Sequence, residues 1–241
     1  MDKGMMMLNR NDLIYLDDDG RERAYNEART LNPGIPGKLV YEMIVASKIP
    51  AIVKRQSSGT GGHTERISHI EVGFSSWRYI DGKRLRVQSV ADTTHITEIK
   101  TPYQIAELFL SDNDLSWRCP DHYKAVEALS SMARGLGITT GLYGSAALAA
   151  ATTLPYINES SNLDLLIKDG RYEDISVFHN KISQERSQVN INLDVELDIG
   201  GGYHIRLIEL FSGQSTIMAK GLYDIKLIDM QDIASYLTIS P

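Results

Sequence analysis

A glycine-serine pair in the middle of the chain has the residue types of a phosphate-binding turn. Gly144-Ser145 follows the strand-like segment 138–143 and precedes Ala146–Ala151, a run of strong helix formers. Glycine lets the backbone approach a ligand closely. The serine hydroxyl and the free amides of a helix start can hold a phosphate, helped by the helix dipole. The same pair could serve only as a helix N-cap, and the pattern leaves both roles open.

Acidic residues follow on two segments that we expect to be strands. Asn162 and Asp164 are two residues apart on one, and Asp194 and Glu196 are two apart on a later one, so each pair points to one face of its strand. Convergent carboxylates bind magnesium, which bridges phosphate oxygens in phosphoryl and nucleotidyl transfer. Polar residues at alternate positions also occur on any solvated strand face. Together with Gly144-Ser145, their order and spacing indicate a nucleotidyltransferase site.

The central part of the chain resembles a known enzyme family. The resemblance is carried by Tyr143-Gly144-Ser145, by Leu154-Pro155-Tyr156 and by Ser161–Leu166 (Ser-Asn-Leu-Asp-Leu-Leu). These segments resemble the phosphoribosyl-dephospho-CoA transferases of malonate decarboxylase, also called holo-acyl-carrier-protein synthases. Weaker similarity in the same order extends over nearly the whole chain, at Asn11–Leu16, Pro50–Arg55, Asp194–Leu197 and Lys220–Leu222.

The resemblance implies a reaction and a cofactor. Members of the family move a phosphoribosyl-dephospho-CoA group from its triphosphate precursor to a serine of the acyl-carrier subunit, and diphosphate leaves. The implied catalytic half belongs to the nucleotidyltransferase superfamily and holds Mg²⁺ through paired aspartates. In this chain the implied metal ligands and catalytic residues are Asp164, one or both of Asp194 and Glu196, and Asn162 as a weak ligand. One of the later acids would take the proton of the acceptor serine, and Gly144-Ser145 would hold the diphosphate.

Asn162 departs from the family's pattern, in which two aspartates stand two positions apart. Asparagine offers a carbonyl oxygen to a metal but no charge, so magnesium binding should be weaker than at a site with three carboxylates. Three explanations stay open: the chain works with a depleted site, it is impaired, or asparagine is not the natural residue at this position.

Several cations could bind substrate phosphates. Lys54 and Arg55 end an expected strand and border the Ser-, Gly- and Thr-rich loop 56–66, and Lys220 lies late in the chain. All three could bind the phosphates of the CoA-derived triphosphate donor, since lysine and arginine suit phosphate recognition. Lys54 and Arg55 could equally border a mobile loop on a solvated edge, but the resemblance implies a basic strand end there and favours the donor. A second basic group beside the expected turn Asp81-Gly82 would bind the acidic carrier, although a solvated hairpin would look the same. That group consists of Lys83, Arg84 and Arg86.

The elements that position these residues are a mixture of helices and strands, which predicts an α+β fold. Residues 1–97 have mainly strand patterns, with one helix at 37–48, and are expected to form a small, mostly-β substrate-binding domain. Residues 98–241 are expected to form a nucleotidyltransferase-like catalytic domain with a mixed sheet and helices. Its predicted strands are 138–143, 163–167, 189–199, 203–211 and 217–228, and its predicted helices begin near 102, 120, 146, 172 and 231.

The composition is that of an ordinary globular protein, with 42% hydrophobic and 23% charged residues in 241. A net charge of −6 disfavours nucleic-acid binding, which normally needs a positive excess. No apolar run approaches the about 18 residues of a membrane-spanning helix, and the apolar start is too short for a signal peptide. The single cysteine, Cys119, cannot form an internal disulfide. We therefore expect a cytoplasmic protein with no membrane partner.

Two alternatives to this interpretation remain. The chain could be another nucleotidyltransferase that acts on a protein or a small molecule. It could also be a non-catalytic binder of the CoA precursor or of the carrier, because Asn162 replaces an expected aspartate. Leu154-Pro155-Tyr156 and the basic residues of the first half favour the carrier-modifying transferase.

Overall fold

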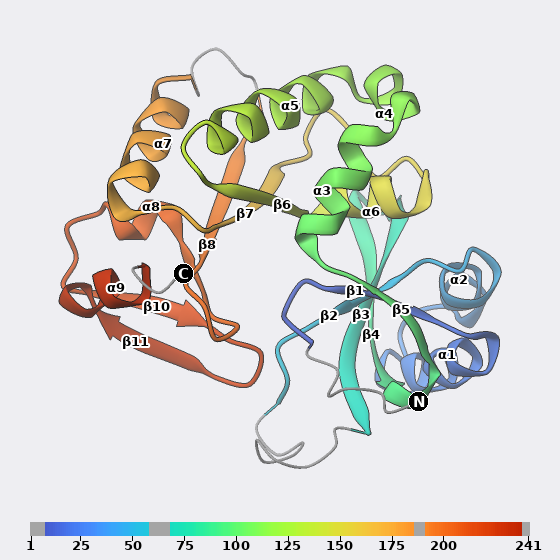
Figure 1. The fold of residues 1–241 in the computed structure, drawn as a ribbon. Helices are drawn as coiled ribbons and strands as arrows, with labels where there is room; N and C mark the ends of the chain where they lie inside the picture. The colour runs from blue at the N-terminus through green and yellow to red at the C-terminus, as the bar shows by residue number, and fades with distance from the viewer. Residues whose placement is uncertain (1–7, 58–67, 186–190, 238–241) are drawn as a thin grey trace. The chain divides into compact units, whose positions relative to one another are not determined.

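The computed structural model describes residues 8–57, 68–185 and 191–237, and Figure 1 shows its ribbon. Helices and strands are both abundant, which confirms the predicted α+β class. The chain forms two compact units. The first runs to Thr101 and includes Leu222–Asp224, and the second comprises Pro102–Gly221 and the chain from Ile225 onward. The loop predicted at 56–66 lies, after Ser57, outside the described residues.

The first unit is built on an antiparallel sheet with the strand order β4-β3-β2-β1-β5. A tight hairpin joins β3 to β4 at Asp81-Gly82, as predicted, and both turn residues have positive φ angles, of 50° and 74°. The strands are β1 (Leu13–Leu16), β2 (Ala51–Val53), β3 (His69–Ile80), β4 (Lys83–Asp92) and β5 (Ile96–Lys100). The helical segments are α1 (Asp18–Leu31), α2 (Gly37–Tyr41), the π-helical η1 (Glu42–Ala46) and the 3-10 turn η2 (Thr93–His95).

Helix α1 was not predicted, because its buried side lacks large apolar residues. The alanines on that side, Ala24 and Ala28, are fully buried. The hydroxyl of Ser89 on β4 donates to the Ala24 carbonyl at 2.7 Å and ties the helix to the sheet. Small side chains allow this close approach, but they leave no hydrophobic period in the sequence.

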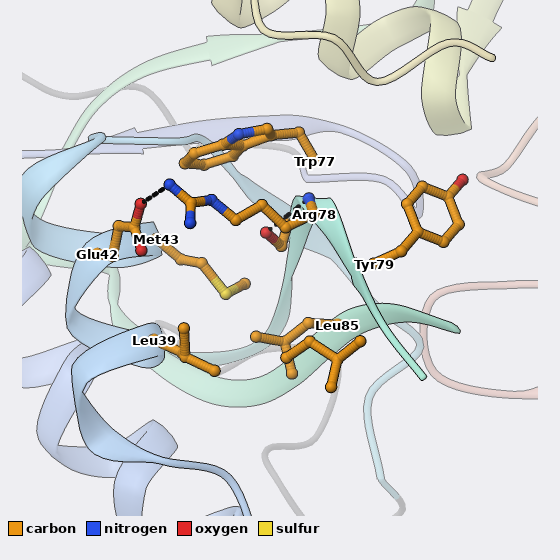
Figure 2. A pocket seen from close by; sticks show the side chains of 9 residues that line it. Leu39, Glu42, Met43, Trp77, Arg78, Tyr79 and Leu85 are labelled. Carbon is orange, nitrogen blue, oxygen red and sulfur yellow. Dashed lines mark hydrogen bonds and ion pairs between the residues drawn. The ribbon is translucent and has the colours of Figure 1, made fainter. Parts of the chain in front are cut away.

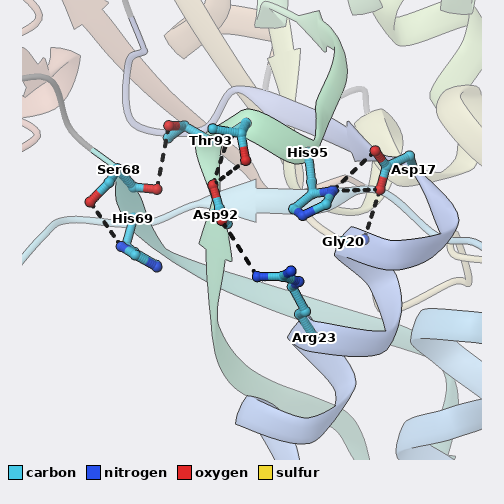
Figure 3. Close-up of polar contacts among 9 residues, drawn as sticks. Asp17, Gly20, Arg23, Ser68, His69, Asp92, Thr93 and His95 are labelled. Atoms are coloured by element: carbon cyan, nitrogen blue, oxygen red, sulfur yellow. Dashed lines mark hydrogen bonds and ion pairs between the residues drawn. The ribbon is translucent and has the colours of Figure 1, made fainter.

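The start of α1 did carry a signal, which is its acidic cap. The carboxylate of Asp17 accepts a hydrogen bond from the Gly20 amide at 2.7 Å and lies 2.9 Å from Nδ1 of His95, as Figure 3 shows. These contacts, the Gly20 amide first, lower the pKa of Asp17. An aspartate cap followed by Asp18 and Asp19 in the first turn favours a helix start.

Arg21 is a buried cation that joins three segments of the first unit. Its Nε donates to the carbonyl of Leu16 at 3.0 Å, at the end of β1. Its Nη1 donates to the carbonyl of Ile44 at 3.0 Å and to that of Ile49 at 2.9 Å. Buried carbonyls need hydrogen-bond donors, and this one side chain supplies a donor to three of them.

The second unit has a mixed sheet, as predicted, with the strand order β11-β10-β9-β8-β7-β6. Among the strands that the structure describes in this sheet, only β7 and β8 pair in parallel. The strands are β6 (Thr139–Tyr143), β7 (Leu163–Lys168), β8 (Leu193–Asp198), β9 (His204–Arg206), β10 (Thr216–Lys220) and β11 (Ile225–Asp229). The helices are α3 (Pro102–Ser111), α4 (Asn113–Arg118), α5 (Pro120–Arg134), α6 (Gly144–Thr152), α7 (Tyr172–Glu185), α8 (Leu207–Leu210) and α9 (Met230–Leu237).

One face of this sheet packs against α5. The Thr140 hydroxyl donates to Ser130 of α5 at 3.0 Å, and Thr140 lies opposite Ile167 of β7. Leu163, Leu165 and Ile167, which share that face, are fully buried. The residues between them on β7 therefore point to the other face of the sheet.

Two segments near the C-terminus differ from the prediction. The strand predicted at 203–211 is the short β9 followed by α8, because Leu207 and Leu210 are buried at helical rather than alternating spacing. The single strand predicted at 217–228 is the hairpin β10–β11, interrupted at 221–224. Among the described residues, no helix has the length and apolar character needed to cross a membrane.

We expect Arg21→Met to destabilise the protein strongly. Methionine keeps much of the buried volume but leaves three carbonyls without their donor, at about 1–3 kcal/mol each for a buried unsatisfied group. Urea unfolding should report a loss of at least about 3 kcal/mol. Arg23→Met, at an exposed position of the same helix, is the control and should change stability by less than about 1 kcal/mol. Equal effects of the two substitutions would contradict an anchoring role for Arg21.

Candidate functional site

The structure brings the predicted acids together on one face of the second sheet. In the parallel pair β7–β8, Asp164 lies opposite Asp194 and Leu166 lies opposite Glu196. Opposite residues of neighbouring strands share a face, and so do residues two apart on one strand. Asp164, Asp194 and Glu196 therefore point to the same side of the sheet, away from α5.

Cations line the same face on the next strands. Arg206 lies opposite Glu196, and its Nη2 is 3.2 Å from Oδ1 of Asp194, which raises the pKa of Arg206. Glu196 is buried, and its carboxylate oxygens lie 3.6 Å from Nζ of Lys220 and 3.7 Å from Nδ1 of the buried His204. We call this surface the polar face. It consists of Asp164, Asp194, Glu196, His204, Arg206 and Lys220.

Gly144 and Asp164 approach each other so closely that any side chain at position 144 would force the Asp164 carboxylate to move. Gly144 has a φ of +66°, and a Cβ on it would collide with Oδ2 of Asp164 and lie 2.9 Å from its Cγ. Tyr143, the residue before Gly144, pairs with Asp164 across β6 and β7. Gly144, which the sequence predicted to let the backbone approach a ligand closely, thus lies directly against the carboxylate of Asp164.

The Gly144-Ser145 pair forms the first turn of α6 rather than its cap. The residue at the cap position is Tyr143, whose side chain makes no capping hydrogen bond. Ser145 is half-buried as the second residue of the helix. The first turn of α6 is thus not capped by the Tyr143 side chain, and it lies at the edge of the polar face, next to Asp164. This arrangement suits an anion, because a helix start attracts negative charge.

Asp164 and Asp194 are the residues of the polar face that could hold a metal ion. Within the described ranges, no group of three His, Cys, Asp or Glu side chains is placed to hold a metal. Asp164 and Asp194 alone lie level on neighbouring strands. Magnesium is commonly bound through one or two carboxylates plus phosphate oxygens and waters, so these two residues are sufficient when a polyphosphate is present.

Asn162 lies beside this pair but is exposed. It comes one residue before β7, two positions from Asp164, and Leu163 between them is buried. Asn192 has the same place before β8, since Leu163 lies opposite Leu193. Asn162 and Asn192 therefore come directly before the two parallel strands, whereas the sequence singled out only Asn162.

His204 and Arg206 are members of the polar face that the sequence analysis did not single out. The strand pattern at 203–211 contained the signal, because residues two apart on a strand share a face. The sequence did not show which strand pairs with this segment. In the structure β9 pairs with β8, and this register brings Arg206 to Asp194 and His204 to Glu196.

The basic residues predicted for the donor are divided between the two units. Lys220 belongs to the polar face, whereas Lys54 and Arg55 belong to the first unit. The aliphatic chain of Lys54 lies over Gly73. Gly73 lies opposite Gln88 of β4. Arg86 is two residues from Gln88 on that strand and therefore points to the same face of the first sheet. One member of each basic group, Lys54 and Arg86, thus lies on the same face, although the sequence favoured separate ligands for the two groups. Arg84 also donates from Nη2 to the hydroxyl of Tyr79 at 2.9 Å.

A separate cavity of about 220 Å³ lies in the first unit between η1 and the hairpin. Its walls are mostly apolar, with Met43, Leu85 and Trp77 among them, as Figure 2 shows. Arg78 crosses it and pairs with Glu42 at 2.6 Å. Because this arginine is already neutralised, the cavity is poorly suited to a polyphosphate.

Fold and site together define an α+β protein whose second unit carries paired carboxylates and cations on one sheet face, beside a glycine-led helix start. The family described as "Phosphoribosyl-dephospho-CoA transferase MdcG C-terminal domain" matches residues 110–231. The chain belongs to this family, and the matched segment contains the whole polar face.

One curated relative is the phosphoribosyl-dephospho-CoA transferase of Bradyrhizobium diazoefficiens. It is 24% identical over 159 residues, which cover 65% of this chain and 66% of the relative. The similarity thus spans slightly less than two thirds of the relative's length. No solved structure matches the chain.

We expect Gly144→Ala to be costly because of Asp164 and not only because of its φ angle. Gly213 also has a positive φ, of +76°, but nothing lies within 4 Å of a Cβ built there. Gly213→Ala should therefore show only the backbone cost, about 1–2 kcal/mol. Gly144→Ala should cost at least about twice as much in denaturant unfolding.

A double substitution separates the two causes. Gly144→Ala combined with Asp164→Ala removes the colliding carboxylate, so the pair should be less destabilised than the sum of the single substitutions. Additive effects would show that the contact between the two residues does not control stability.

Proposed function

We propose that this chain transfers a phosphoribosyl-dephospho-CoA group from its triphosphate precursor to a serine of the malonate decarboxylase acyl-carrier subunit. The serine oxygen attacks the phosphorus next to the ribose, a new P–O bond forms, and the bond to the leaving diphosphate breaks. The serine proton passes to a carboxylate of the polar face. Family membership and the activity for which the Bradyrhizobium relative is named support the donor. The carrier follows from the resemblance.

The observation that carries the proposal is the contact between the α6 start and the paired carboxylates. A nucleotidyl-type transfer needs an anion site for the leaving diphosphate directly beside the groups that neutralise the attacked phosphate. Gly144 provides this juxtaposition, because its missing side chain lets the first turn of α6 lie against Asp164. Both residues lie inside the family segment 110–231.

Magnesium is the cofactor that the site would use. Asp164 and Asp194 would hold it, with Asn162 as a neutral neighbour. Bound there, the ion would neutralise charge on the phosphates and polarise the attacked phosphorus. Lys220 would bind donor phosphates. The two aspartates therefore have the metal-binding role that the sequence distributed over four residues.

Glu196 has a different role in this proposal. It is buried between Lys220 and His204, so it already has two positively charged or polar neighbours. A carboxylate so placed would position Lys220 rather than bind a metal. Asp194 is half-exposed and better placed than Glu196 to accept the serine proton. To free Oδ1 of Asp194 for this role, the Arg206 guanidinium would have to move away from it.

A second function, binding without catalysis, is supported by Asn162. The chain would then hold the donor or the carrier without transferring the group. Intact-mass analysis of the carrier after incubation with the protein, the donor triphosphate and magnesium separates the two functions. Catalysis adds the mass of the prosthetic group and depends on magnesium, whereas binding leaves the carrier mass unchanged.

Asp164→Ala should abolish transfer while the protein stays folded. The metal contribution to the transition state is several kcal/mol, so the rate should fall at least about a hundredfold. Asp121→Ala, which removes an exposed acid from the first turn of α5, is the matched control and should keep normal activity. Near-normal transfer by folded Asp164→Ala would overturn the site assignment.

Asn162→Asp should tighten magnesium binding and raise the rate. The substitution adds a charged ligand to the strand pair. It should also slightly destabilise the magnesium-free protein, because two carboxylates then repel each other. Magnesium titrations with the donor triphosphate present would measure both affinity and rate. The control is Asn26→Asp, which makes the same change at an exposed position of α1. Unchanged titrations would place residue 162 outside the site.

A further inference from the structure

The cavity of the first unit lies between two irregular elements. One of them is η1, where the Ser47 amide donates to the Glu42 carbonyl at 2.8 Å and closes a π-helical turn. Such a turn holds one residue more than an α-helical turn, is rare in proteins and is frequent at functional sites. Glu42 and Met43, the first two residues of η1, both line the cavity. The π-helical turn is therefore part of the cavity wall.

The other irregular element is a bulge in the β3–β4 hairpin. Three residues of β3, Ser76–Arg78, lie opposite one residue of β4, Leu85. Bulges bend a strand and re-aim its side chains, and they are common next to active sites. Neighbouring residues of a regular strand point to opposite faces. Trp77 and Arg78, although neighbours, both line the cavity, and so does Leu85 (Figure 2).

The lining selects a small group without net charge. The volume of about 220 Å³ is below the roughly 300–1,000 Å³ of pockets that hold a whole drug-sized ligand. The cavity can therefore hold one part of the large donor but not all of it. Arg78 and Glu42 neutralise each other at 2.6 Å, which disfavours a phosphate. The apolar side chains of the lining include Leu39, Met43, Ile80 and Leu85.

The donor has two parts without phosphate, the adenine ring and the pantetheine arm, and the cavity suits the ring. The guanidinium carbon of Arg78 lies 5.7 Å from the centroid of the Trp77 ring, so two planar groups are available in one wall. Nucleobases stack on aromatic rings and on arginine planes. The Glu42 carboxylate can accept more hydrogen bonds than the one from Arg78, and the amino group of adenine donates them. A flexible arm without a ring would not stack.

We propose that this cavity binds the adenine ring of the CoA-derived donor. The inference rests on the proposed function and adds to it the site that recognises the base. It concerns the first unit alone, because every residue of the lining belongs to that unit. It also explains two departures from regular structure together, since the π-helical turn and the bulge build the same cavity.

The test fills the cavity and uses adenosine and dephospho-CoA as probes. Leu39→Trp adds a large ring to the lining, so the base loses its space and its stacking partners. Calorimetry should show at least about tenfold weaker binding of both probes. Leu31→Trp makes the same change at a residue of α1 that is 51% exposed and should leave both affinities unchanged. The affinity for 4′-phosphopantetheine, which lacks the base, should be the same in all three proteins.

Tryptophan fluorescence gives a direct readout of the cavity. The chain has two tryptophans, and Trp117 is 85% exposed. Trp117→Phe therefore leaves Trp77 as the sole reporter at little cost in stability. Adenosine should change the emission of Trp77 over the same concentration range in which calorimetry detects binding.

Trp77→Leu keeps the test valid if Leu39→Trp unfolds, because it keeps an apolar wall and removes the ring. It should weaken adenosine binding at least about fivefold. Unchanged adenosine binding in a folded variant would overturn the inference. Weaker binding of 4′-phosphopantetheine with adenosine unaffected would assign the cavity to the arm and overturn it too. Adenosine binding can be measured without the carrier, so a failure of the unsubstituted protein to modify the carrier would overturn the proposed function separately.

Discussion

The contact between Gly144 and Asp164 is the constraint on which the arrangement of the second unit depends. The first turn of α6 can lie against the carboxylate only because residue 144 has no side chain and accepts a φ of +66°. This contact joins β6, α6 and β7 at one point. Asp194 is then brought alongside by the parallel pairing of β7 and β8. A larger residue at 144 would push the start of α6 and the Asp164 carboxylate apart or force that carboxylate to another position.

In the polar face, neighbouring cations reduce the electrostatic repulsion between closely grouped carboxylates. Three carboxylates on one face would repel each other, but Arg206 lies 3.2 Å from Asp194, and Lys220 lies 3.6 Å from the buried Glu196. Such pairing lowers the repulsion in the absence of ligand. It also means that a phosphate or metal ligand must exchange with existing partners. The half-exposed pair of Asp194 and Arg206 can open at less cost than the buried contacts of Glu196, because exposed ion pairs are weak.

The sequence predicted most of the second unit because its signals are local. The proline-led starts of α3 and α5, the alanine run of α6 and the apolar β7 each follow from a few consecutive residues. The α1 helix was missed because its buried side consists of small residues, and His204 and Arg206 were missed because their importance depends on strand pairing. Register between strands distant in sequence is not encoded in any short segment, so the polar face could be predicted only in part.

Order across the second sheet decides which of these groups one ligand can reach. The start of α6 lies against Asp164 of β7, Asp194 of β8 lies opposite Asp164, and Arg206 of β9 and Lys220 of β10 follow on the same face. Neighbouring strands are about 4.8 Å apart, so one to three strand spacings separate the cations from the aspartates. Under the proposed function, a polyphosphate donor is long enough to contact both kinds of group at once. The pairing of strands that are distant in sequence, rather than any one motif, therefore sets the reach of the site.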